Sequence, residues 1–148
     1  MTLLSTNPIP KQDGRDYIRS CEVRFDFTAA GPALATHAHP DVFTLPAGSR
    51  VVGGEVVVDV AGVGPATSTI DIGDLGGGGA AQADRYTATP VDLKTLGRTA
   101  LTLTGFRYAE TEGIDFEIIN ATTGPLTAGA FYVRIDYVVE DRAHEVQE

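Results

Sequence analysis

Alternation of apolar and polar side chains is the feature that most limits how this chain can fold. Near the C-terminus every second residue is apolar: Phe131, Val133, Ile135, Tyr137 and Val139. Because successive side chains of a strand point to opposite faces, this run predicts a strand with one buried face. We expect residues 130–140 to form one of the longest strands and the first four of these side chains to face the core.

Shorter runs with the same alternation or a β-branched bias predict further strands at 22–28, 41–45, 50–60, 67–73, 99–104 and 114–120. The pair Gly53-Gly54 indicates a bulge inside the run 50–60. Helix signals are nearly absent, and only residues 89–97 fit one short capped turn, which we leave open against an irregular loop. Seven or eight short strands without helices bury their apolar faces best as two packed sheets. The predicted fold class is therefore all-β, an antiparallel β-sandwich.

The length of 148 residues fits one domain with two flanking segments. Residues 1–16 contain Pro8, Pro10 and Gly14 and predict an extended N-terminal arm, residues 17–140 the β-sandwich domain, and residues 141–148 an acidic C-terminal tail. The arm also carries three apolar side chains that a free tail has no reason to expose: Leu3, Leu4 and Ile9. We expect these three residues to form a partner-binding segment that orders on another protein's surface. Residues 74–83, with four consecutive glycines, predict a mobile loop.

The formal net charge of −9 argues against a nucleic-acid partner, because a phosphate backbone would be repelled. No run approaches the roughly 18 consecutive apolar residues of a membrane helix, so we expect no membrane partner. We also find no signal peptide, which predicts a protein that stays in its compartment of synthesis or leaves within a larger assembly. The single Cys21 is interpreted as a small buried apolar residue.

The most specific chemical candidate is the pair His37 and His39, because two histidines two residues apart on a strand can share a metal ion. A glycine six residues before His37 copies the opening of the cupin metal motif. The glutamate of that motif is missing, since Phe43 and Thr44 stand where it belongs. The remaining histidine, His144, lies in the charged tail. We therefore expect no metal site and keep His37 and His39 as weak candidates only.

Other site chemistry finds less support. Asp71, Asp74 and Asp84 flank the glycine run and raise a calcium hypothesis, but EF-hand spacing is missing and solvated loop acids are favoured. The chain has no Gly-x-Ser-x-Gly motif and no phosphate-binding loop. We expect no catalytic residue and no cofactor, and hence a protein that is not an enzyme.

Four segments resemble a known family in the same order along the chain: 41–55, 67–74, 83–86 and 127–139. They are a Leu-Pro-Ala-Gly turn into a long strand, a strand ending Gly-Asp, an Asp-Arg-Tyr after a Gly/Ala-rich loop, and a long alternating last strand. They are similar to the small β-sandwich proteins that tailed bacteriophages encode in their head modules. The resemblance implies a jelly-roll-like capsid decoration, or cement, protein.

The same resemblance implies a non-enzymatic structural protein on the outer surface of the capsid in the virion, present in the host cytoplasm during assembly. Its implied partners are the major capsid protein and itself, as a homo-oligomer, trimer or dimer, and its implied role is to stabilise the head. Three alternatives stay open. They are a receptor- or carbohydrate-binding module of a phage tail or baseplate, a cupin-like metal-binding protein and a bacterial surface-adhesion sandwich.

Overall fold

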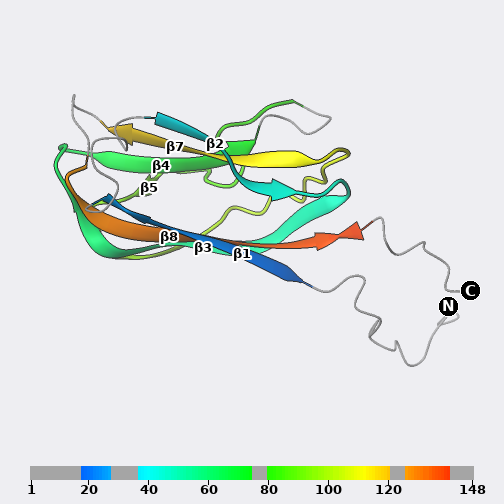
Figure 1. The fold of residues 1–148 in the computed structure, drawn as a ribbon, viewed down its shortest axis with the longest axis horizontal. Helices are drawn as coiled ribbons and strands as arrows, with labels where there is room; N and C mark the ends of the chain where they lie inside the picture. Colours follow the sequence, from blue (N-terminus) through cyan, green and yellow to red (C-terminus); the bar gives the residue numbers. More distant parts are fainter. Residues whose placement is uncertain (1–17, 28–36, 75–79, 121–125, 141–148) are drawn as a thin grey trace, which may run out of the picture.

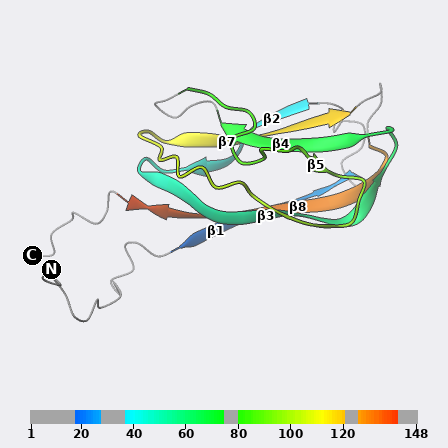
Figure 2. The same ribbon diagram turned by 180° about the vertical axis from the view of Figure 1, so that it is seen from behind.

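The computed structural model describes residues 18–27, 37–74, 80–120 and 126–140. Within these ranges the chain forms eight strands: β1 (Arg19–Asp26), β2 (His37–Leu45), β3 (Ser49–Val63), β4 (Ser68–Asp74), β5 (Val91–Asp92), β6 (Gly97–Ala100), β7 (Glu112–Asn120) and β8 (Ala128–Val139). They build two four-stranded sheets, with the order β1-β8-β3-β6 in sheet A and β2-β7-β4-β5 in sheet B. The two sheets lie face to face (Figure 1, Figure 2). The predicted all-β sandwich is confirmed.

The strand pairing is that of a jelly roll. Four of the antiparallel pairs match those of one long hairpin that is folded back on itself. These pairs are β1–β8, β2–β7, β3–β6 and β4–β5. Rolling this hairpin brings β3 beside β8 and β4 beside β7, which closes the two sheets over each other. Because Arg19 lies opposite Tyr137, the start of β1 and the end of β8 lie at the same end of the sandwich (Figure 1).

Alternating side chains from the two sheets fill the core. Sheet A contributes Val56, Val58, Phe131, Val133 and Ile135, and sheet B contributes Ile70, Ile72, Ile114, Phe116 and Ile118, all of them buried. The ring of Phe25 stacks on Phe131 with 5.0 Å between centroids and lies 5.8 Å from Phe116, so it bridges the sheets. The burial predicted for Phe131, Val133 and Ile135 is confirmed, whereas Tyr137 is only partly buried at the edge of the core.

The predicted bulge in the long third strand is confirmed. The register of β3 against β8 shifts between Val51 and Gly53, and Gly54 has a φ of 139°. A Cβ at Gly54 would lie 2.3 Å from the carbonyl oxygen of Arg134. Glycine is therefore required where the bulge brings the two backbones together.

One local prediction is wrong, and one alternative that the sequence left open is decided. The strand expected at 99–104 is β6, which ends at Ala100, because the Thr102 amide then donates to the carbonyl of Tyr86 at 2.8 Å and draws the chain away from β3. Leu101 is buried but Leu103 is 52% exposed. The helical turn considered for 89–97 does not form, because Asp92 accepts from the Lys94 amide and the Thr95 hydroxyl. Such an Asx-type turn competes with helix initiation.

Candidate functional site

Only some of the predicted site residues belong to the residues that the structure describes. Leu3, Leu4 and Ile9 of the arm, residues 1–16, lie outside the described residues, as do the tail 141–148 and His144. His37 and His39 belong to β2, where their backbones lie opposite Ile118 and Phe116 of β7, and their side chains are not described. Among the described residues, no group of three or more His, Cys, Asp and Glu side chains is placed to hold a metal ion.

The most elaborate polar arrangement is a buried cluster at the end of β4, formed by Asp74, Arg85, Tyr86 and Tyr108. The Asp74 carboxylate accepts from the guanidinium of Arg85 at two points, with Arg85 Nη2 3.1 Å from Oδ1, and from the hydroxyl of Tyr108 at 2.7 Å. Arg85 Nη2 also donates to the carbonyl of Ala80 at 2.8 Å. Asp74 is 2% exposed and Arg85 is 7% exposed, so both charges are buried. Each residue neutralises the charge of the other, which would be costly to bury alone.

Two tyrosines extend the cluster into the sandwich. The hydroxyls of Tyr86 and Tyr108 are 2.6 Å apart, and both side chains are fully buried. Burial raises the pKa of Tyr86 to about 12. Burial, together with the hydrogen bonds to Tyr86 and Asp74, raises the pKa of Tyr108 as well. Both phenols are therefore neutral at physiological pH and serve as hydrogen-bonding groups.

The backbone around the cluster is held equally closely. Asp74 and Gln82 exchange two backbone hydrogen bonds of 3.0 Å, and the Tyr86 amide donates to the carbonyl of Ile72 at 2.9 Å. At Gly73 an added Cβ would lie 2.0 Å from the Gln82 carbonyl oxygen. The chain that follows the glycine run is thus fixed on β4 by main-chain contact, and Arg85 covers the ring of Phe106 at 3.8 Å.

The geometry assigns this cluster a structural role. Asp74 is committed to Arg85 and Tyr108, which occupy the carboxylate that the calcium hypothesis needs beside Asp71 and Asp84. The interpretation of Asp74 as a solvated loop acid is wrong, because its side chain is buried. Sequence reasoning singled out Asp74 and Arg85 but missed their pairing. The available signals were the Gly-Asp that ends one strand and the Asp-Arg-Tyr that follows the glycines.

Cys21 is half-buried on β1, with its sulfur 3.7 Å from the carbonyl oxygen of Ile135. Burial raises the pKa of its thiol to about 11. The thiol is therefore protonated near neutral pH and lacks the thiolate that a nucleophile or metal ligand needs. The sequence predicted a small buried residue, whereas Cys21 is only half-buried because β1 is an edge strand of sheet A.

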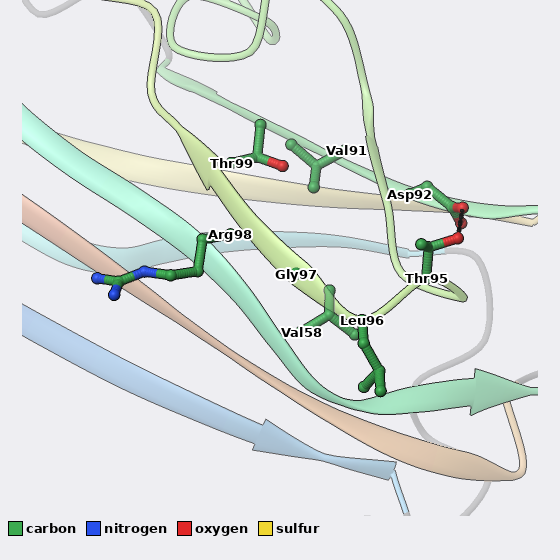
Figure 3. Close-up of a pocket in the computed structure, with 8 residues that line it drawn as sticks. All are labelled: Val58, Val91, Asp92, Thr95, Leu96, Gly97, Arg98 and Thr99. Atoms are coloured by element: carbon green, nitrogen blue, oxygen red, sulfur yellow. Dashed lines mark hydrogen bonds between the residues drawn. The ribbon is translucent and has the colours of Figure 1, made fainter.

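A pocket of about 300 Å³ opens where the edge strands β5 and β6 approach each other (Figure 3). Its lining comprises Val58, Val91, Asp92, Thr95, Leu96, Gly97, Arg98 and Thr99. No aromatic ring is among these eight residues, so the pocket lacks the stacking platform typical of a sugar site. The 62% exposed Leu96 lies at its rim, beside Val58 of β3 (Figure 3).

The outer faces of the two sheets differ in charge. On sheet A carboxylates are matched by arginines: Glu55 binds Arg98 at 2.6 Å and lies 3.6 Å from Arg134, and Arg24 pairs with Asp59. Sheet B contains no lysine or arginine in any of its four strands. Asp71 lies opposite Glu117 there, and burial together with the negative charges of Asp84 and Glu117 raises its pKa. One face is thus internally neutralised and the other acidic.

Comparison with known proteins gives likeness at the level of structure. No protein-family model matches the chain, and no curated protein matches it by sequence. A chain of the capsid asymmetric unit of cyanophage Pam1 matches over 90% of this chain and 93% of its own length, with 20% identity and a TM-score of 0.60. The match to a chain of the Ralstonia phage GP4 capsid covers 90% of this chain and 90% of that chain, with 19% identity and a TM-score of 0.59.

A third match is a chain in the acidic stable capsid structure of Helicobacter pylori bacteriophage KHP30. It covers 83% of this chain and 88% of its own length, with 13% identity and a TM-score of 0.57. This chain therefore shares its fold with chains of three phage capsids. The matches span nearly the whole length of each chain, so the likeness extends to the complete sandwich.

No helix of the described residues is long and apolar enough to cross a membrane.

Proposed function

We propose that this protein is a non-enzymatic phage structural protein that binds the outer surface of a capsid shell and stabilises the head. The observation that carries the proposal is the fold shared, over 83–90% of this chain, with chains of three phage capsids. The chain's own chemistry supports it, since the buried polar cluster is committed to holding segments together.

The charge distribution supports a place outside the shell. A net charge of −9 and an acidic sheet B face would be repelled by the phosphates of packaged DNA. The same charge on the outer surface keeps particles from associating with one another. The proposed partners are the major capsid protein and further copies of this chain, and the proposed location is the virion exterior after assembly in the host cytoplasm.

The proposed contact to the shell is the N-terminal arm, residues 1–16, through Leu3, Leu4 and Ile9. An extended segment of this length spans up to about 50 Å, which is enough to cross onto a neighbouring subunit. Ordering the arm on its partner costs conformational entropy, and burial of the three apolar side chains offsets that cost.

Binding of the purified protein to undecorated capsids of the phage that encodes it tests the proposal. We expect saturable co-sedimentation with the capsids, and weaker binding after deletion of residues 2–14 with little change in melting temperature. A full-length protein that stays in the supernatant would refute the capsid role. A deleted variant that binds equally well would refute only the role of the arm.

Carbohydrate binding by a tail or baseplate module is the alternative outcome of this experiment. A protein that does not bind capsids but is retained on host-cell glycans would support this alternative. The cupin-like alternative would require a stoichiometric metal ion that is lost on His37→Ala.

A further inference from the structure

The four sheet edges of the sandwich are unequally protected against pairing with another chain. β5 and β6 are only two and four residues long. β2 contains Pro40, and its register shifts between His39 and Phe43. Short edge strands, prolines and irregular register all hinder strand addition.

β1 lacks these features. Its eight residues pair with β8 from Arg19 opposite Tyr137 to Asp26 opposite Ala130 without any shift of register. In the part of the chain that the structure describes, β1 pairs on that side alone and ends the sheet order β1-β8-β3-β6. Figure 1 shows it as the outermost ribbon of sheet A. A regular edge of this length presents a row of backbone donors and acceptors to an added strand.

The side chains of β1 are self-complementary around Val23. The exposed residues of the strand are Ser20, Glu22, Arg24 and Asp26, and the half-buried ones alternate with them. When two copies of the strand run antiparallel around a two-fold axis through Val23, each Glu22 lies opposite Arg24 of the partner subunit. Each Ser20 then lies opposite Asp26 of the partner subunit. Exposed residues meet exposed residues, so the outer face of the sheet continues across the junction.

We propose that β1 pairs antiparallel with β1 of a second copy around this axis, which joins the two A sheets into one eight-stranded sheet. The interface is isologous and closed, as a two-fold dimer requires. This pairing needs no capsid, so its test in solution is independent of the proposed function.

The charges also select this register over its neighbours. Moving the axis to Glu22 places the two Glu22 carboxylates opposite each other. Moving it to Arg24 places the two guanidinium groups opposite each other and each Glu22 opposite Asp26 of the partner subunit. Like charges directly opposite destabilise a strand pair, whereas opposite charges stabilise it.

Arg24 has donors left for this contact. Its Nη1 already binds Asp59 of the same chain. A guanidinium carries five N–H donors, so Arg24 can hold Asp59 and Glu22 of the partner subunit together. Such a shared arginine links the dimer contact to the charge pattern of sheet A.

A charge-reversal series tests the pairing by sedimentation of the full chain. We expect the wild type to dimerise, and Glu22→Arg or Arg24→Glu to raise the dimer dissociation constant at least ~10-fold, because each creates two like-charge pairs. The double variant restores opposite charges and should recover most of the affinity. Glu117→Arg on β7 makes the same change in net charge as Glu22→Arg, away from β1, and should leave dimerisation unchanged.

Single cysteines on a Cys21→Ser background test the register. Val23→Cys places the two new thiols opposite each other at the axis, where antiparallel Cα atoms are about 4.5–5.5 Å apart and a disulfide fits. We expect oxidation to convert this variant into a covalent dimer. Glu22→Cys and Arg24→Cys should give little covalent dimer, because their thiols would lie opposite each other only in the two competing registers.

Several results would overturn the proposal. The proposal fails if the wild-type protein stays monomeric at high concentration or forms a trimer. It also fails if the dimer persists in both single charge-reversal variants. Stronger cross-linking of Glu22→Cys or Arg24→Cys than of Val23→Cys would refute the axis through Val23.

Discussion

The carboxylate of Asp74 shows how single residues hold this sandwich together. It is enclosed by Arg85 and the hydroxyl of Tyr108, residues that are far apart along the chain. Removing the carboxylate leaves a buried guanidinium without its counter-charge, which is the costly half of a broken ion pair. The cluster therefore stabilises the packing of residues 80–108 on β4.

Asp74→Ala should lower the free energy of unfolding by about 3–5 kcal/mol. Asp84→Ala is the matched control, because this carboxylate is exposed in the same part of the chain and its loss should cost under about 0.5 kcal/mol. Urea denaturation of both variants measures the difference. Equal stabilities would show that the cluster contributes little.

The buried tyrosines predict a loss of stability at alkaline pH. The folded protein holds the pKa of Tyr86 at about 12, and that of Tyr108 is raised in the same direction, above the value of about 10 in an unfolded chain. The neutral phenols therefore contribute stability that is complete below about pH 10 and is lost as the pH rises through about 12.

Ultraviolet titration of the phenolate band checks this prediction. Of the five tyrosines, we expect two to ionise only near or above pH 12, or together with unfolding. The double variant Tyr86→Phe and Tyr108→Phe should lose this late fraction. Titration of all five phenols near pH 10 in the folded protein would contradict the burial of the pair.

At the scale of strands, Gly73 determines how closely the following segment approaches β4. Gly73→Ala places a Cβ within 2.4 Å of three backbone atoms of Gln82 and Ala83, so the segment must move. We expect destabilisation by several kcal/mol, on the order of other severe core lesions. At Gly53 the corresponding Cβ meets only the side chain of Asp136 at 3.1 Å, so Gly53→Ala should cost much less. Thermal unfolding that ranks the two variants in the opposite order would refute this packing.

Adjacent isoleucines on β7 provide a matched test of strand orientation. Ile118 is fully buried between the sheets, whereas Ile119 is 38% exposed on the outer face of sheet B. Ile118→Asp strands a carboxylate in the core and should abolish folding or cost at least about 4 kcal/mol. Ile119→Asp should leave the protein folded. Circular dichroism during thermal melting distinguishes them, and similar melting curves would refute the assigned faces.

Alternation predicted the strands well because the face of each side chain depends only on the parity of its position. Phe131, Val133 and Ile135 are buried as expected, and the bulge at Gly53-Gly54 follows from local glycine chemistry. The end of β6 was missed because a tertiary hydrogen bond from Thr102 to Tyr86 ends it. The Asp74 cluster was missed for the same reason, since its partners meet only after the sheets have packed.

At the scale of the whole molecule, the two sheets divide the surface into a neutralised face and an acidic face. The arginines of sheet A pair with carboxylates of their own chain, whereas the strands of sheet B carry no basic residue. The start of β1 and the end of β8 lie together at one end of the sandwich. In the proposed function, the N-terminal arm binds the shell from this end and the acidic face points toward solvent.

The most direct test of the capsid proposal is a cryo-electron microscopy map of the virion that encodes this chain. The account predicts jelly-roll density that fits this sandwich, repeated at equivalent lattice positions on the outer surface of the shell. Density for the chain inside the shell or confined to the tail, or its absence from purified virions, would contradict the account.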